Sequence, residues 1–158
     1  MTDVLQKPEL IIRQYHDLTP YEDRFLEMKT FTETRDEHSP DQLWILQHQD
    51  VLTQGQAGKP EHILIPSNIP VIQTDRGGQV TWHGPGQLVA YFMFDLNRLG
   101  WNVRTLVSYA ENLMIELLKN MALMPMPNRM PPGFTLLNAK LAHLVLKFAK
   151  AVAIMVCP

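Results

Sequence analysis

The stretch from Val71 to Leu96, VIQTDRGGQVTWHGPGQLVAYFMFDL, decides the expected fold of this chain. An apolar extended run breaks at Gly77-Gly78 and again at the turn His83-Gly84-Pro85-Gly86, and it resumes as an apolar strand from Leu88. Six of the eight glycines lie between Gly55 and Gly86, where they permit tight turns and close approach of another group. Polar loops held between two buried strands are a common framework for a binding site.

The same spacing also fits an ordinary hairpin with a long connection. Side-chain chemistry separates the two interpretations, because Asp75, Arg76, Gln79, Thr81 and His83 fall within nine residues. This density of polar groups favours a ligand-binding loop.

Length and composition limit the class of protein. A chain of 158 residues is most simply one domain with a substantial core. Residues 1–14 lack the basic start and apolar run of a signal peptide, and no apolar stretch reaches membrane-spanning length. The single cysteine, Cys157, excludes an internal disulfide framework and a cysteine-based zinc cluster. We expect a soluble cytoplasmic protein with no membrane or nucleic-acid partner.

Hydrophobic patterns predict a mixed α/β (α+β) fold, in which a mixed sheet has flanking helices. Short continuous apolar runs are typical of buried strands. The expected strands cover residues 10–13, 43–46, 71–73 and 88–94, and the last two are expected in the interior of the sheet.

The first expected helix follows Pro20, which suits the first helical position. Thr19 is placed to cap it, and Glu22 completes a capping box. The charged run Thr32 to His38 is expected to be the solvated end of this helix. Its core-facing residues recur at helical spacing: Tyr21, Phe25, Met28 and Phe31.

The second expected helix runs from Val103 to Lys119, and Asn102 can cap it. Apolar residues recur there at intervals of three and four, which places them on one face. They are Val103, Leu106, Val107, Ala110, Leu113, Met114, Leu117 and Leu118.

The chemistry of the loops leaves several alternatives open. His83 can serve as a general base or as an orienting hydrogen-bond donor. Arg76 can hold an anion or pair with Asp75. The loop Thr53 to Lys59 lacks the spacing of a phosphate-binding loop, so it gives little support for nucleotide binding. Because no metal-binding histidine pairing and no nucleophile elbow occur, the residues alone indicate a ligand-binding domain without an evident nucleophile.

The run Asp75 to Gln87, DRGGQVTWHGPGQ, resembles the octanoyltransferase family of lipoate biosynthesis, as do TQGQAG at 53–58 and IPVI at 69–72. The similarity covers roughly residues 10 to 120. It implies a fold akin to the catalytic domains of biotin and lipoate protein ligases, and it implies no cofactor. The implied reaction moves octanoyl from octanoyl-acyl carrier protein to a cysteine thiolate, which a nearby lysine favours. The acyl group then passes to a lysine of a lipoyl domain, in a 2-oxoacid dehydrogenase or in the glycine cleavage system.

The resemblance also implies the site residues. The acyl-substrate pocket would be lined by Arg76, Gly77, Gly78, Gln79, Val80, Thr81, Trp82 and His83. Gly77 and Gly78 would let the backbone approach the acyl chain, and His83 would orient polar groups. No metal is implied.

Composition changes abruptly after Asn120. Residues 1–120 carry ten Lys and Arg against all 16 acidic residues, whereas residues 121–158 carry four basic residues and no acid. Family segments of the form K-P-D-A-P-G-V, K-I-x-S-L-G and C-S-[YF]-H-G-L-A, which hold the lysine and the nucleophilic cysteine, are not evident there. Lys140 has no Ser-Leu-Gly after it, and Cys157 has no family context.

A change of reading frame accounts for this departure. If each codon is taken as the last base of one residue and the first two bases of the next, Met121/Ala122 must give Gly and Met130/Pro131 must give Ala. With free third bases, the tail can then read K-P-D-A-P-G-V-Y, followed by K-V-G-S-L-G-L-K-I-R-K-G-C-S-Y-H-G-L. We therefore expect a frameshift, or a sequence error, near Asn120.

This interpretation divides the chain into residues 1–120, the N-terminal part of the catalytic domain, and residues 121–158, an out-of-frame tail without family counterpart. Composition favours a helix over residues 141–156. No octanoyl transfer is expected from the chain as written. One alternative is a non-catalytic remnant that binds an acyl chain or a lipoyl domain. Another is a relative of the lipoate or biotin ligases that uses a nucleotide.

Overall fold

A computed structural model describes residues 9–59, 61, 63 and 68–120, without the side chain of Leu118, and the backbone of short strands between residues 126 and 153. Within these residues, no helix has both the length and the apolar character needed to cross a membrane.

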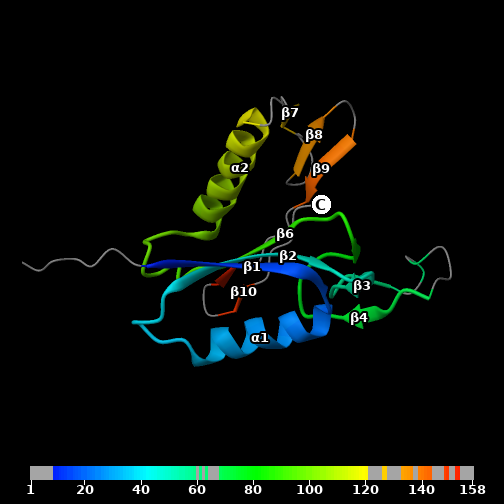
Figure 1. Ribbon diagram of the computed structural model, residues 1–158, viewed down its shortest axis with the longest axis horizontal. Helices are drawn as coiled ribbons and strands as arrows, with labels where there is room; N and C mark the ends of the chain where they lie inside the picture. The colour runs from blue at the N-terminus through cyan, green and yellow to red at the C-terminus, as the bar shows by residue number, and fades with distance from the viewer. Residues whose placement is uncertain are drawn as a thin grey trace, which may run out of the picture.

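The main sheet has three strands in the order β1-β2-β6. Strand β1 (Leu10–Thr19) is parallel to β2 (Asp41–His48), and β6 (Val89–Met93) is antiparallel to β2. Helix α1 (Tyr21–Thr34) connects the two parallel strands, as such a pair requires, and covers one face of the sheet. Helix α2 (Val103–Asn120) lies on the other face (Figure 1). The mixed α/β fold is therefore confirmed.

Two apolar clusters fill the space between these layers. Because successive residues of a strand point to opposite faces, Tyr91 and Met93 enter the cluster under α1 whereas Phe92 enters the cluster under α2. The cluster under α1 consists of Met28, Trp44, Leu46, Val89, Tyr91 and Met93. The cluster under α2 consists of Phe92, Phe94, Leu96, Leu106 and Ala110.

A small second sheet carries the glycine-rich loops. Its order is β4-β3-β5, with β3 (Val51–Gln54) parallel to β4 (Val71–Gln73) and antiparallel to β5 (Val80–His83). Only two residues separate β2 from β3, so the small sheet begins directly where the main sheet ends (Figure 1).

The last strands described are short. They are β7 (Met126–Pro127), β8 (Gly133–Leu136), β9 (Ala139–His143), β10 (Phe148–Ala149) and β11 (Val152–Ala153). Strands β7 to β9 form one antiparallel sheet, β10 and β11 form a hairpin, and β11 lies near β6. The expected helix over 141–156 is wrong for the described residues, since they form strands.

The second helix matches its prediction closely. The Asn102 side-chain oxygen accepts a hydrogen bond from the Thr105 backbone N–H at 2.9 Å, which is a capping contact. Leu106 and Ala110 are buried against the sheet. Val103, Leu113 and Leu117 are exposed, so the apolar stripe is wider than the surface that covers it in the described residues.

The predicted cap of the first helix is wrong. Helix α1 begins after Pro20, and no side chain caps its first turn. Thr19 belongs to β1 instead, where it pairs with His48 and its hydroxyl donates to the Gln47 carbonyl at 3.2 Å. Thr19, which the local pattern assigned to the helix cap, is therefore the last residue of β1 and pairs with β2.

Two further expectations need correction. Residues 32–38 are not simply solvated, since Thr32 is buried and donates its hydroxyl to the Met28 carbonyl at 2.8 Å. Among the described residues, β4 and β6 are both edge strands of their sheets, whereas interior positions were predicted. Val71 in β4 is 49% exposed, but β6 is mostly buried by the layers on its two faces. A three-residue apolar run does not reveal on how many sides it is covered.

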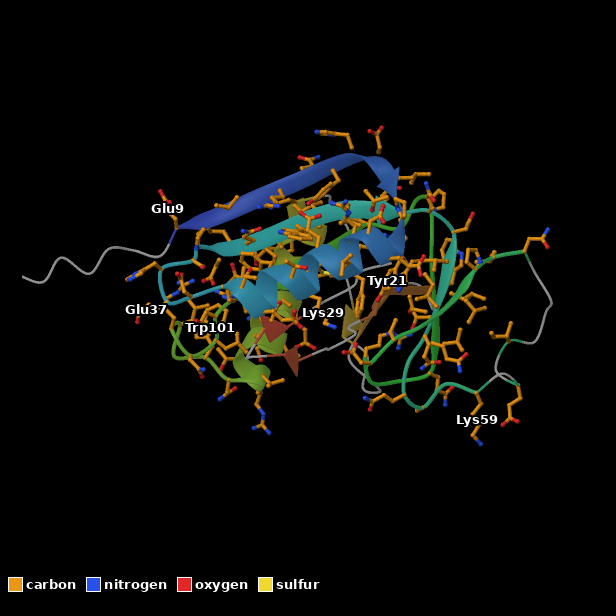
Figure 2. All side chains as sticks on the ribbon, turned by 90° about the horizontal axis from the view of Figure 1, so that it is seen from below. Glu9, Tyr21, Lys29, Glu37, Lys59 and Trp101 are labelled. Atoms are coloured by element: carbon orange, nitrogen blue, oxygen red, sulfur yellow. The ribbon has the colours of Figure 1, made fainter. Side chains whose placement is uncertain are left out.

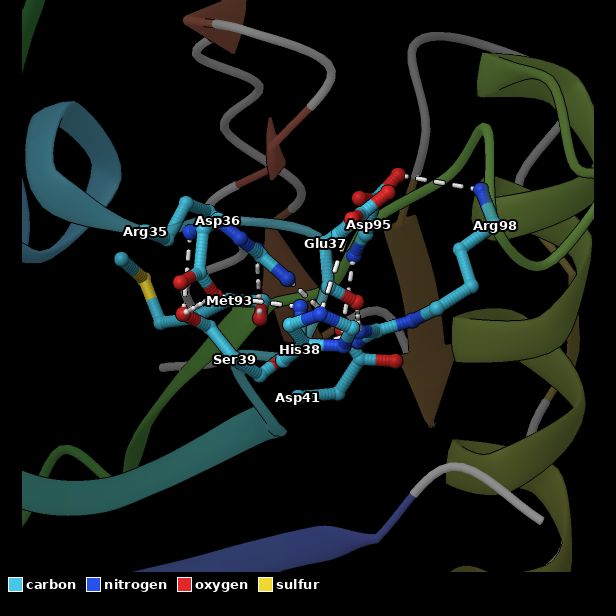
Figure 3. Close-up of polar contacts among 9 residues, drawn as sticks. All are labelled: Arg35, Asp36, Glu37, His38, Ser39, Asp41, Met93, Asp95 and Arg98. Carbon is cyan, nitrogen blue, oxygen red and sulfur yellow. Dashed lines mark hydrogen bonds and ion pairs between the residues drawn. The ribbon is translucent and has the colours of Figure 1, made fainter. Parts of the chain in front are cut away.

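Asp41 anchors the connection between α1 and the main sheet (Figure 3). Its Oδ1 accepts hydrogen bonds from Arg35 Nη2 at 3.1 Å, from Arg98 Nη2 at 2.7 Å and from the Asp95 backbone N–H at 2.8 Å. Arg35 also donates to the Met93 carbonyl at 3.2 Å. One buried carboxylate therefore joins the end of α1, the start of β2 and the turn after β6.

We predict that Asp41→Asn lowers the free energy of unfolding by roughly 3 kcal/mol, because it leaves the buried Arg35 guanidinium without a counter-charge. The control is Glu116→Gln, which breaks an exposed pair with Lys119 and should cost less than about 1 kcal/mol. Urea unfolding of both variants measures the difference. Equal losses would contradict the structural role of Asp41.

Candidate functional site

The glycine-rich loop between β4 and β5 is built around the Arg76 side chain, which is 6% exposed. Arg76 Nη2 donates to the Thr53 carbonyl at 2.6 Å and to the Gln79 carbonyl at 3.0 Å, and Nη1 donates to the Gly77 carbonyl at 2.8 Å. Arg76 Nε and Nη2 also donate to the Thr53 hydroxyl, at 3.2 and 2.8 Å. Burial lowers the pKa of Arg76 from its ordinary value. These contacts make Arg76 the structural centre of the loop.

The segment after β3 packs directly on this loop. Backbone N–H groups of Gly55, Gln56 and Ala57 donate to the Gln79, Arg76 and Gly78 carbonyls at 2.9, 2.9 and 3.1 Å. A Cβ on Gly55 would lie 2.5 Å from the Gly78 oxygen and 2.7 Å from the Gly77 oxygen. Glycine at position 55 is therefore required by close approach of two backbone segments.

His83 ends β5 and is buried. Its Nδ1 lies 2.7 Å from the Gln87 side-chain oxygen, and its Nε2 lies 3.4 Å from the Thr53 hydroxyl. Through Thr53, the imidazole shares a hydrogen-bond network with Arg76.

A second buried histidine, His48, ends β2. His48 Nε2 lies 2.7 Å from the Tyr91 hydroxyl, and Nδ1 lies 3.1 Å from the Thr19 carbonyl. Burial lowers the pKa of His48 to about 4 and raises the pKa of Tyr91 well above its ordinary value. His48 is consequently neutral at neutral pH, with its proton on Nδ1 and its Nε2 accepting from Tyr91.

Tyr21 joins the two imidazoles. It lies at the end of α1 nearest the small sheet (Figure 2), and its ring stacks on His83 with centroids 6.0 Å apart and planes at 6°. The Tyr21 centroid lies 5.2 Å from that of His48, and the two imidazole centroids are 6.0 Å apart. Burial raises the pKa of Tyr21 to about 12, although the nearby Arg76 charge opposes the shift.

We call Tyr21, His48, His83 and Tyr91 the histidine–tyrosine cluster. Its members come from α1, β2, β5 and β6, at the junction of the two sheets. Both phenols stay protonated and His48 stays neutral at neutral pH, so these three members of the cluster offer uncharged polar atoms. Such a surface can orient a polar, uncharged group beside an apolar chain.

The structure separates the predicted site residues by strand alternation. Thr81 and His83 share the inward face of β5 with Thr53 of the neighbouring strand. Val80 and Trp82 point to the opposite face, where Trp82 is 42% exposed and donates to the Asp50 carboxylate at 3.1 Å. The exposed members of the predicted set are Gly77, Gly78, Gln79 and Trp82.

Three members of the cluster were missed at the level of sequence. Trp44, Leu46 and His48 alternate on one face of β2, so extending the apolar alternation by two residues would have found His48. Tyr91 lies between Val89 and Met93 on the same kind of face. Their convergence with Tyr21 depends on tertiary packing and has no local signal.

A separate groove of about 540 Å³ lies between α1 and the edge of the main sheet. Arg13, Arg24, Phe31 and Trp44 line it, and Glu27 forms ion pairs there with both arginines. None of residues 76–83 borders it. Among the described residues, no group of three or more His, Cys, Asp or Glu side chains could hold a metal ion.

Comparison with known proteins identifies the family. Residues 19–150 match the lipoyl protein ligase A/B catalytic domain. The octanoyltransferase of Acinetobacter baylyi is 61% identical over 150 residues, which is 95% of this chain and 68% of that protein. The chain belongs to the octanoyltransferase family. The octanoyltransferase of Pseudomonas putida strain W619 is 52% identical to this family member over 130 residues, which is 82% of the chain and 60% of the relative.

Solved structures agree on the fold. A bipartite lipoate protein ligase from Thermoplasma acidophilum, described with its E2 lipoyl domain, has a TM-score of 0.68 at 12% identity, and the match covers 94% of this chain and 61% of that one. The P. falciparum LipL1 in complex with lipoate has a TM-score of 0.67 at 12% identity and covers 94% and 46%. The predicted likeness to the lipoate ligase catalytic domain is therefore confirmed.

Two facts concern the extent of the match. This octanoyltransferase-family chain spans 60% to 68% of the length of the curated relatives named above. The family match ends at residue 150, so it includes residues beyond Asn120. The boundary at residues 120 and 121 stays a prediction, as does the assignment of residues 76–83 to a substrate pocket.

We predict that Gly55→Ala destabilises the fold by about 1–3 kcal/mol, because its methyl group would collide with the Gly77 and Gly78 carbonyls. Gly77→Ala is the matched control, since nothing lies within 4 Å of its Cβ position. It should change stability by about 1 kcal/mol at most. Denaturant midpoints measure both, and a tolerated Gly55→Ala would show that the two segments do not pack as described.

We also predict a pH dependence from His48, whose folded pKa of about 4 lies below the ordinary 6.5. The unfolded chain binds more protons between these values, so stability contributed by neutral His48 is full above 6.5 and is lost as the pH falls toward 4. The loss amounts to roughly 3 kcal/mol.

The measurement compares the wild type with His48→Gln in urea at several pH values. The difference in free energy of unfolding should shrink as the pH falls from 6.5 to 4. His38→Gln, on an exposed loop, is the control and should leave the wild-type slope unchanged. A wild-type advantage over His48→Gln that is constant across this range would refute the buried neutral state.

Proposed function

We propose that this site belongs to an enzyme that transfers octanoyl from octanoyl-acyl carrier protein to the lysine of a lipoyl domain, the first step of protein lipoylation, through a cysteine acyl-enzyme. The proposed protein partners are the carrier protein and the lipoyl domains of 2-oxoacid dehydrogenases and of the glycine cleavage system. The proposed location is the cytoplasm, and no cofactor or metal is required.

The observation that carries this proposal is the way DRGGQVTWHGPGQ folds. The segment wraps around the buried Arg76 and delivers His83 into the histidine–tyrosine cluster. Relatives that are 61% and 52% identical are named octanoyltransferases, which supports the same chemistry here. In the proposed pocket, residues 76–83 contact the acyl substrate, and the cluster orients the thioester carbonyl.

A lipoate or biotin ligase activity is the second candidate. Two solved neighbours are described as a lipoate protein ligase and as a protein in complex with lipoate, but their 12% identity carries the fold alone. The ligase alternative needs a site for a nucleotide phosphate. Arg76, the cation of the glycine-rich loop, is instead occupied by carbonyl and hydroxyl oxygens. We therefore favour the transferase.

The chain as written is proposed to lack activity. Transfer through an acyl-enzyme requires a thiolate and a group that favours it, and removing a nucleophile abolishes most of the rate enhancement. We propose that Lys140 and Cys157 stand outside the family segments that would give them these roles. We propose that one base lost near the Asn120 codon explains their absence, and sequencing the gene across codons 119–122 tests this directly.

The expected result is no octanoyl transfer by the 158-residue chain and recovery of transfer when one base is restored near codon 120. The assay incubates each form with octanoyl-acyl carrier protein and an apo lipoyl domain, and mass spectrometry measures the mass of the domain. Cys157→Ser is the matched control and should change nothing. Transfer by the 158-residue form that survives Cys157→Ser and is lost in His83→Ala would contradict the proposal and indicate direct transfer.

A further inference from the structure

The Tyr21 hydroxyl differs from the other polar groups of the histidine–tyrosine cluster, because it makes no hydrogen bond within the part of the chain that the structure describes. Tyr91 donates its hydroxyl proton to His48 Nε2 at 2.7 Å, and His48 Nδ1 donates to the Thr19 carbonyl at 3.1 Å. Both ring nitrogens of His83 have polar contacts as well. Tyr21 therefore brings to the cluster a hydroxyl that the described fold does not use.

This hydroxyl is neither sealed in the core nor fully surrounded by water. In the same described residues, the fully buried polar atoms without a partner are guanidinium nitrogens of Arg24, Arg35 and Arg98, so the Tyr21 oxygen keeps some access to solvent. Partial burial nevertheless raises the pKa of Tyr21 to about 12, which keeps the hydroxyl protonated and able to donate. A partly desolvated donor without an acceptor costs free energy, so the stability of the fold gives no reason to keep it.

Neighbouring rings hold the Tyr21 side chain in one orientation. Its plane lies at 17° to that of Phe25 and at 6° to that of His83, with centroids 5.9 and 6.0 Å away. The imidazole of His48 packs against the same ring, with its centroid at 5.2 Å. The charges of residues 75 and 76 both act on the phenol, so it lies beside the glycine-rich loop. A donor whose direction is fixed before binding loses little conformational entropy when a ligand arrives.

We propose that Tyr21 positions the substrate, with its hydroxyl donating a hydrogen bond to the carbonyl oxygen of the octanoyl thioester. This role rests on the proposed function and deepens it. The aromatic rings of the cluster suit the alkyl chain, and the thioester oxygen is the first acceptor that follows that chain. A neutral hydroxyl matches this oxygen because the thioester carries no charge.

The binding test uses the full 158-residue chain and two probes, S-octanoyl-pantetheine and S-octyl-pantetheine. The second probe is a thioether with a methylene group in place of the carbonyl, so it keeps the alkyl chain and lacks the acceptor. Tyr21→Phe keeps the ring and removes only the hydroxyl. In calorimetric titrations, Tyr21→Phe should weaken binding of the thioester by roughly fivefold, the usual contribution of one neutral hydrogen bond, and should leave binding of the thioether unchanged.

Tyr109→Phe is the matched control for binding. Tyr109 is 42% exposed on α2, and its ring also packs against another aromatic ring, that of Trp101, with centroids 5.0 Å apart. This variant should change the affinity for neither probe.

A second measurement, on the free protein, determines whether the fold uses the hydroxyl. The urea midpoint of Tyr21→Phe should equal or exceed that of the wild type, because the variant removes a partly desolvated group without a partner. Tyr91→Phe is the comparison, since it removes the hydroxyl bonded to the buried His48 and should lower the midpoint. A decrease for Tyr21→Phe as large as that for Tyr91→Phe would show a structural hydroxyl and overturn the inference.

The binding outcomes separate the role of Tyr21 from the proposed function. A loss confined to the thioester, with the urea midpoint maintained, supports both. If the thioester binds and Tyr21→Phe weakens both probes equally or neither of them, the role of Tyr21 is overturned and the proposed function stands. If the wild type binds neither probe, the proposed function is contradicted, and the role of Tyr21 that rests on it is contradicted with it.

Discussion

The guanidinium of Arg76 is the constraint on which the site depends. A buried charge is costly unless hydrogen bonds or a partner charge compensate it. Here the charge is met by the carbonyl dipoles of Thr53, Gly77 and Gln79 and by the Thr53 hydroxyl. These acceptors belong to β3 and to the loop before β5, so satisfying one cation fixes the relative position of both segments. This arrangement packs Gly55 against the Gly77 and Gly78 carbonyls and places His83 beside the Thr53 hydroxyl.

A second buried polar centre organises the other end of the molecule. Asp41 accepts hydrogen bonds from two guanidinium groups and one backbone N–H, and these bonds fix the position of the connection from α1 to the sheet. With α1 held at its end by Arg35 and along its length by the apolar cluster, Tyr21 at its start is brought over His83 and His48. The histidine–tyrosine cluster therefore forms where α1, which Asp41 fixes, contacts the small sheet, which Arg76 fixes.

Local patterns in the sequence were sufficient to predict the elements in which buried residues recur at regular spacing. The apolar run of β6 and the threes-and-fours spacing of α2 predict those elements because each signal lies within one segment. His83 was also singled out as a candidate, since its glycine-rich surroundings are unusual. Thr19 was misassigned because a helix cap and a strand end look alike until the partner strand is known. Likewise, the opposite directions of Trp82 and His83 follow only from the register of β5 on β3.

We propose that an octanoyl chain lies against residues 76–83 and the histidine–tyrosine cluster. Nuclear Overhauser contacts between S-octanoyl-pantetheine and the aromatic protons of this protein test it most directly. We expect contacts from the octanoyl methylene protons to the rings of Tyr21 and His83. Contacts to Trp44 and Phe31 in the groove beside α1, with none to Tyr21 or His83, would contradict it.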